Sequence, residues 1–284
     1  MFAMKMRLLF PAIAVSFAFT FASFLPLSAQ DQTVETTPML DQGFHKMYNL
    51  RFLEAHAIFA KYMAEHPEDP MGPVSDAAAY LFAEFHRTDV LDMQLFTSDA
   101  NYMHHKTNPD PAVKKSFDAD LDKADGLSDA ILGKQPNDAT ALFAKTLAFG
   151  MRADYASLIE RRDIAGFQFT KAGSAYAHRL LQVDPHAYDA YLAVGMENYI
   201  LGLKPAPVRW LLQMAGGETN RTLGEHDLEL TAAQGHYLKP LAKLLLSVAA
   251  MRDNDKVRAR ELLSSLAQEF PNNPLYAEQL AKLK

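Results

Sequence analysis

The sequence predicts an all-α protein: a signal peptide followed by antiparallel helix pairs that stack into an α-solenoid. Three observations support this prediction: an apolar leader, a helical spacing of apolar residues after it, and a recurring combination of small, apolar and proline residues. The 284 residues are 49% hydrophobic and 22% charged, which is enough apolar material for a large core. Cysteine is absent, which excludes disulfides, thiolate metal sites and cysteine nucleophiles.

Residues 1–29 have the architecture of a secretory signal peptide. Lys5 and Arg7 form a short positive region, and the next charged residue is Asp31. Leu8 to Leu27 is almost wholly apolar, and Leu27-Ser28-Ala29 is a tolerable cleavage site with a small residue just before the cut. An uncleaved membrane anchor is the alternative, because 23 uncharged residues are about enough to cross a bilayer, although two prolines weaken a continuous helix. We therefore expect a periplasmic or secreted protein, with N-terminal membrane anchoring as the alternative.

The remainder of the chain is predicted to be helical. Residues 30–38 are polar and are expected to form a flexible lead-in, so that residues 39–284 make up one helical repeat domain. No alternating run of β-branched residues indicates a strand. Proline disfavours the helical conformation in the residue before it, so helix ends are expected near the prolines that follow. These are Pro67, Pro70, Pro73, Pro109, Pro136, Pro185, Pro205 and Pro271.

Four of these prolines share a local pattern. A small residue stands twelve positions before the proline, with apolar side chains eight and five positions before it. The sets are Ala55, Phe59, Tyr62 and Pro67; Ala124, Ser128, Ile131 and Pro136, with one polar exception; Gly173, Ala177, Leu180 and Pro185; and Ala259, Leu263, Leu266 and Pro271. A small side chain lets two helices approach closely, and the bulky ones fill the groove between them. The pattern is that of the second helix of a tetratricopeptide repeat, and irregular proline spacings of 69, 49 and 86 residues make the repeats divergent.

A second resemblance covers about a third of the chain, from Tyr188 to Pro271. It rests on the segments YDAYLAVGMENYILG, PVRWLLQMAGG, LGEHDLELTAAQGHYLKPLAKLLLSVAA and KVRARELLSSLAQEFPNNP. Their order resembles the family that contains tetratricopeptide repeat protein thirty-nine, the fungal inclusion-body-clearance protein and bacterial relatives. The turn after Gly216-Gly217 departs from that family, because residues 218–221 match its charged turn only loosely. The resemblance implies an interaction protein, in some members associated with membranes, with no shared catalytic residues.

Several patterns that resemble functional sites have a simpler explanation. Asp118, Asp120, Asp122 and Asp129 imitate a calcium loop, but Lys123 stands where the loop needs glycine, so we expect a solvated helix face. No histidine pair has the spacing of a helical metal site, and the three consecutive residues 225–227 diverge around a helix rather than forming an acid–base site. The net charge is −6 without a clustered basic face, which argues against nucleic acid. We expect no cofactor, no metal and no enzymatic activity.

The function predicted from the sequence is that of an exported adaptor that binds a protein or peptide in the groove of the helical array. The candidate groove residues come from the first helices of predicted pairs: Lys145, Arg152, Tyr191, Glu197 and Asn198. Asn198 takes a position that the repeat gives to an aromatic residue, so its amide needs a partner within the fold or on a ligand.

Trp210, the only tryptophan, is a further candidate for partner binding. It lies on a short amphipathic segment between prolines, helped by Arg209, for which a partner or peripheral membrane contact is one hypothesis and core packing the favoured one. The alternative function is binding of an apolar small molecule or lipid in a cavity of the irregular middle region, residues 164–217. The aromatic and methionine residues behind this alternative are Met151, Phe167, Phe169, Met196, Trp210 and Met214.

Overall fold

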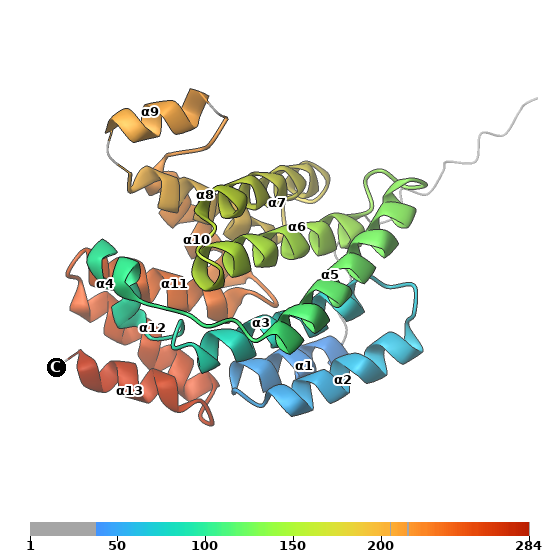
Figure 1. Ribbon diagram of the computed structural model, residues 1–284, viewed down its shortest axis with the longest axis horizontal. Coiled ribbons are helices and arrows are strands. Elements are labelled where there is room, and N and C mark those ends of the chain that lie inside the picture. Colours follow the sequence, from blue (N-terminus) through green and yellow to red (C-terminus); the bar gives the residue numbers. More distant parts are fainter. Residues whose placement is uncertain (1–37, 205, 215, 284) are drawn as a thin grey trace, which may run out of the picture. The chain divides into compact units, whose positions relative to one another are not determined.

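The computed structural model describes residues 38–204, 206–214 and 216–283, apart from the side chain of Asp99, and within these ranges it contains helices and no strand. The predicted leader and most of the predicted lead-in lie outside the described residues. The elements are α1 (Pro38–Tyr48), α2 (Phe52–Glu65), α3 (Met71–Arg87), η1 (Met93–Phe96), α4 (Asp99–His104), α5 (Pro111–Leu132), α6 (Ala139–Asp154), η2 (Tyr155–Ile159), α7 (Asp163–Val183), η3 (Tyr188–Ala190), α8 (Tyr191–Gly202), α9 (Ala206–Met214), α10 (Arg221–Gln234), α11 (Lys239–Arg252), α12 (Lys256–Glu269) and α13 (Pro274–Lys282) (Figure 1). The all-α class is confirmed.

The prolines mark helix boundaries as the sequence predicts. α2 ends at Glu65, α7 at Val183 and α12 at Glu269, each two residues before its proline. Pro73 differs, because it lies in the first turn of α3, where its missing N–H breaks no helical hydrogen bond.

The small residues of the repeated pattern lie at buried helix contacts. Ala55, Ala124, Gly173 and Ala259 are all buried. Gly43, twelve residues before Ala55, makes the reason explicit: a Cβ atom there would lie 2.6 Å from Cζ of Phe59. Close docking of helices at small residues, on which the predicted fold depends, is therefore confirmed at these positions.

Successive long helices pack on one another in chain order. The contacts run from α1 to α2 and α3, through α5, α6 and α7 to α8, and from there to α10, α11, α12 and α13. Second-neighbour contacts join α1 to α3 and α3 to α6. α9 departs from this order, because α8 packs extensively on α10 and α9 contacts α8 only weakly.

The first helices also contact the last ones. The hydroxyl of Tyr48 donates to the carbonyl of Tyr237 at 2.9 Å, and Nδ2 of Asn273 donates to the carbonyl of Tyr48 at 2.9 Å. A third contact of this kind joins α13 to the segment after α3: Nε2 of Gln279 donates to the carboxylate of Asp92 at 3.0 Å. In an open solenoid each repeat touches only its neighbours, so an open solenoid alone does not account for these contacts.

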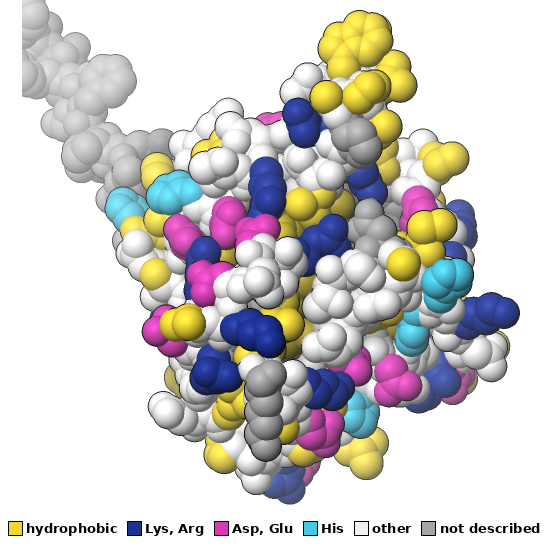
Figure 2. Space-filling view, turned by 90° about the vertical axis from the view of Figure 1, so that its left-hand side faces the viewer, with side chains coloured by type: hydrophobic (Ala, Val, Ile, Leu, Met, Phe, Trp, Pro, Cys, Tyr) yellow, Lys and Arg dark blue, Asp and Glu magenta, His cyan; other side chains and the backbone are white. Residues whose placement is uncertain are grey.

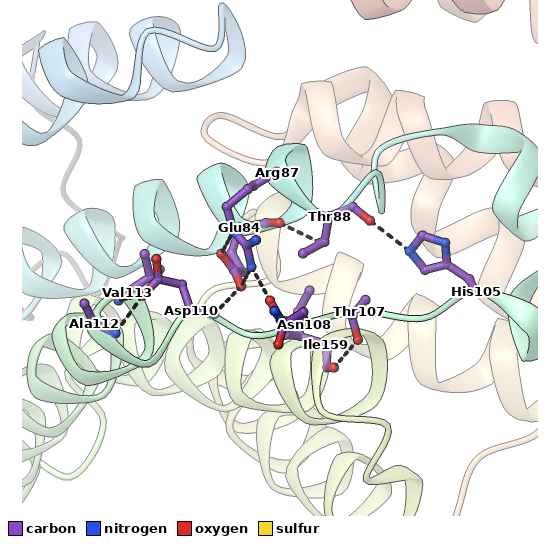
Figure 3. A network of polar contacts seen from close by, with 10 residues as sticks. All are labelled: Glu84, Arg87, Thr88, His105, Thr107, Asn108, Asp110, Ala112, Val113 and Ile159. Atoms are coloured by element: carbon purple, nitrogen blue, oxygen red, sulfur yellow. Dashed lines mark hydrogen bonds and ion pairs between the residues drawn. The ribbon is translucent and has the colours of Figure 1, made fainter.

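The connection from α4 to α5 is fastened to α3 by a polar network (Figure 3). The buried carboxylate of Glu84 accepts hydrogen bonds from Nε (2.8 Å) and Nη2 (2.6 Å) of Arg87 and from the backbone N–H of Asp110 (3.0 Å). His105 contacts the carbonyl of Thr88 at 2.8 Å. The network satisfies a buried charge with groups of the chain itself, and we assign it a structural role.

Candidate functional site

Several exposed large apolar side chains are gathered on the single helix α9. Trp210, Leu211 and Met214 are 61%, 59% and 69% exposed, and Val208 is also exposed. No residue of α9 is buried. In Figure 1 α9 stands apart from the helices on which α8 packs, and Figure 2 shows hydrophobic side chains on the projection at the top of the view. Apolar side chains gathered at the surface are typical of sites that contact another molecule.

The apolar face of α9 points away from the body of the protein. Pro207, Trp210, Leu211 and Met214 are spaced by three, four and seven residues, which places them on one face of the helix. All four are exposed, whereas Arg209 and Leu212, on the other side, are partly buried. A helix of a globular protein normally turns its apolar stripe toward the core. α9 has the opposite orientation.

The two ends of α9 explain why the helix is short and set apart. Pro207 is tolerated in the first turn, where helical N–H groups have no partner. At the other end the backbone N–H of Gly216 donates to the carbonyl of Gln213 at 2.9 Å, and that of Gly217 to the carbonyl of Leu212 at 2.8 Å. Gly216 has φ of +78°, a conformation that other residues adopt at a cost.

Beyond this turn, Glu218 fastens the chain to α7 and α8. Its carboxylate contacts Nε2 of His178 at 2.9 Å and accepts from Nδ2 of Asn198 at 2.6 Å. Its backbone N–H donates to Oε1 of Glu197 at 3.1 Å, and the backbone N–H of Asn220 donates to Oδ1 of Asn198 at 3.0 Å. Glu197 and Asn198 are buried, so they hold the segment that follows α9 from inside the protein.

Asp227 on α10 lies near this network. Burial raises the pKa of its carboxyl to about 6, and the negative charge of Glu218 adds to the rise, while His226 and His178 oppose it. A Cβ atom added to Gly195 on α8 would lie 2.9 Å from the Cβ of Asp227, which shows how closely α8 and α10 approach here. Glu225, two residues earlier, pairs instead with Arg258 at 2.9 Å. Glu225 and Asp227 therefore have different neighbours.

The structure distributes the predicted groove residues over several internal contacts. Nζ of Lys145, which is buried, lies 2.7 Å from Asp129 and 3.2 Å from Asp125. Arg152 pairs with Asp125 at 2.6 Å and with Asp122 at 3.0 Å. Both cations of α6 are thus neutralised by carboxylates of α5. The acidic residues whose spacing imitates a calcium loop all lie along the single α-helix α5.

The other predicted residues differ in their surroundings. Tyr191 is half-buried, and its hydroxyl donates to the carbonyl of Pro185 at 3.3 Å. Asn198 finds the partner that its position requires within the fold, in Glu218. Core packing, the favoured interpretation of Trp210, is wrong because its side chain is exposed. Sequence reasoning missed Glu218 and His178, because 40 residues separate them and no local spacing indicates their contact.

A separate cluster of titratable groups joins α2, α3 and α5. Nδ1 of His56 lies 2.6 Å from Oδ1 of Asp76, which is buried, and Asp76 also contacts Asp120. Burial, and then the charge and hydrogen bond of Asp76, raise the pKa of Asp120 to about 7. The folded protein therefore retains a proton that the unfolded chain releases at lower pH.

This shift predicts a pH-dependent effect of Asp120→Asn. A raised carboxyl pKa contributes stability that is complete below the unfolded pKa, near 4, and is lost as pH rises through about 7. The neutral asparagine cannot lose a proton, so we expect the variant to gain about 1 kcal/mol relative to wild type between pH 5 and pH 8, after allowance for solvent screening. Urea unfolding at both pH values measures this gain. Glu278→Gln, at an exposed position, should show no comparable change, and an equal change in both variants would contradict the assignment.

Comparison with known proteins gave no match to a family model, to a curated protein or to a solved structure. Among the described residues, no three His, Asp or Glu side chains are placed to hold a metal ion. None of the helices in the described ranges combines the length and apolar character needed to cross a membrane.

Proposed function

We propose that this protein is an exported, non-enzymatic scaffold or adaptor of tetratricopeptide-like helix pairs that engages its partner through the apolar face of α9. The observation that carries the proposal is the outward orientation of Trp210, Leu211 and Met214 on a helix with no buried residue. Aromatic and methionine residues are enriched at contacts between molecules. The helical scaffold fixes where this face lies, and α9 supplies the contact.

The proposal places the partner on α9 rather than in a groove of the array. Lys145 and Arg152 pair with carboxylates, and Glu197 and Asn198 hold the backbone after α9. These groups would have to give up internal partners before they could bind a ligand, which costs free energy. The exposed face of α9 has no such cost.

The alternative, an apolar ligand in a cavity of residues 164–217, is less favoured. Two of the residues behind it, Trp210 and Met214, point outward instead of lining an interior. Met151, which is buried, packs in the main core. The same apolar side chains thus favour a surface contact over an enclosed cavity.

The double variant Leu211→Ser/Met214→Ser tests the proposal. We expect its binding to the envelope fraction of the host cell to fall about tenfold or more, because exposed anchor residues carry much of the energy of a contact. The melting temperature should stay within about 1 °C of wild type, because surface substitutions usually change stability little. Co-sedimentation and circular dichroism measure the two effects.

The matched control is Leu53→Ser/Val257→Ser, which removes two apolar side chains that are 87% and 67% exposed on α2 and α12. It also replaces two exposed apolar side chains by serine, but away from α9. The proposal requires that this control binds as wild type does. Equal binding by both double variants would show that α9 is not the contact.

A further inference from the structure

The segment that contains α9 has an unusual distribution of charged residues. From Asn198 to Gly217 the chain has no acidic residue, although Asp and Glu make up 34 of its 284 residues. The same stretch contains Lys204 and Arg209. This segment is locally positive in a protein whose net charge is −6.

Two further contacts extend the pattern. Lys171 lies beside the turn after α9, with its Nζ 2.9 Å from the position of a Cβ on Gly216. The first acidic residue after α9 is Glu218, whose carboxylate is engaged by His178 and Asn198. The end of α9 is therefore flanked by a cation, and its nearest carboxylate in sequence is held by internal partners.

We infer that α9 docks in the plane of a membrane that contains anionic lipids, with Trp210, Leu211 and Met214 entering the headgroup boundary. This inference rests on the proposed function and names the partner of the same face. Amphipathic helices of this type combine an apolar face containing tryptophan and leucine with a basic polar face. Tryptophan itself favours the boundary between headgroups and hydrocarbon.

The orientation of the side chains fits this docking. Arg209 lies on the side of α9 opposite the apolar face, and its Nη1 donates to the carbonyl of Lys204 at 3.2 Å. The guanidinium of Arg209 is thus held against the backbone of Lys204 at the start of the helix. When the apolar face is inserted, we expect both basic residues to lie near the headgroups. Ile200, exposed near the end of α8, adds apolar surface just before this point.

Trp210 makes the test specific, because it is the only tryptophan in the chain and reports α9 alone. The full chain is titrated with vesicles of equimolar phosphatidylglycerol and phosphatidylcholine, and separately with phosphatidylcholine vesicles. With the anionic vesicles we expect the tryptophan emission to move to shorter wavelength and acrylamide quenching to fall. Binding to the neutral vesicles should be about tenfold weaker or more, because each basic residue near an anionic surface strengthens binding.

Two variants separate the apolar contribution from the charge. Leu211→Glu should abolish the emission shift, whereas Leu53→Glu, the same change at an exposed position on α2, should preserve it. Lys204→Gln/Arg209→Gln should bring binding to anionic vesicles close to that for neutral ones, as should high salt. Each variant is checked by circular dichroism, which should show unchanged helix content because none of these side chains is buried.

No emission shift with anionic vesicles, an equal shift with both lipid compositions, or an unchanged shift in Leu211→Glu would overturn the inference. Failure of this inference and failure of the proposed function give different results. If Leu211→Ser/Met214→Ser loses binding to the envelope fraction while wild type ignores the vesicles, the partner is a protein and only the lipid assignment is wrong. If the envelope fraction binds wild type and Leu211→Ser/Met214→Ser equally well, the proposed function itself is wrong.

Discussion

Replacing Gly224 by alanine is expected to destabilise the protein by about 3 kcal/mol, because no space exists for one more carbon atom where α8 crosses α10. A Cβ at this position would lie 2.5 Å from the carbonyl oxygen of Gly195 and closer still to the backbone nitrogen of Tyr199. These are backbone atoms, which cannot rotate away as a side chain does. The two helices would have to separate, and the extensive contact between α8 and α10 would loosen.

The matched control is Gly126→Ala on α5, where a Cβ would meet nothing within 4 Å. Alanine there should stabilise the helix by about 0.5–1 kcal/mol, because glycine loses more conformational freedom on folding. The same substitution, glycine to alanine, is thus expected to lower stability at one helical position and to raise it at the other. Scanning calorimetry should show Gly224→Ala melting roughly 6–12 °C lower and Gly126→Ala slightly higher than wild type. If Gly224→Ala loses no more stability than an ordinary surface substitution does, the close crossing of α8 and α10 is contradicted.

Asp189→Ala is expected to cost about 3–5 kcal/mol, because it removes the acceptor of three backbone hydrogen bonds. The buried carboxylate of Asp189 accepts from the N–H groups of His236 (2.8 Å), Tyr237 (2.9 Å) and Leu238 (3.1 Å), in the connection between α10 and α11. Without it these donors lose their partner within a closely packed region. Burial raises the pKa of this carboxyl, and the three hydrogen bonds oppose that rise.

Asp189→Asn separates hydrogen bonding from charge. Its carbonyl oxygen can keep the bonds to His236 and Leu238, so we expect a loss of about 1–2 kcal/mol, smaller than that of the alanine variant. Asp122→Ala, at a side chain that is 78% exposed, is the control and should change stability by about 0.5 kcal/mol or less. Guanidinium unfolding measures all three. An equal loss for alanine and asparagine would show that the oxygen acceptor is not what Asp189 contributes.

The periodic features of the fold were accessible from the sequence because they depend on neighbours within one helix or one helix pair. Ala55, Ala124, Gly173 and Ala259 were predicted at helix contacts from their distance to a proline, and all are buried. The need of Asn198 for a polar partner followed from its position, but the identity of that partner did not. Glu218 lies 20 residues away, across α9.

The orientation of α9 could not be predicted in the same way. Its spacing of apolar residues indicates an amphipathic helix, and such a pattern is the same whether the apolar face meets the core or another molecule. The breaks around α9 allow either arrangement. In the folded protein α8 and α10 approach closely at Gly195 and Gly224 and pack on each other, so α8 makes only a weak contact with α9.

The all-α class, the proline-marked helix ends and the small residues at which helices dock were thus predictable from the residues alone, because each follows from local sterics and helical periodicity. The direction in which α9 faces, the groups that hold the segment after it and the contact of Tyr48 with residues near the C-terminus become visible in the folded protein. These features depend on contacts between residues 20 to 225 positions apart. Their pairing is set by how whole helices pack, which no local spacing encodes.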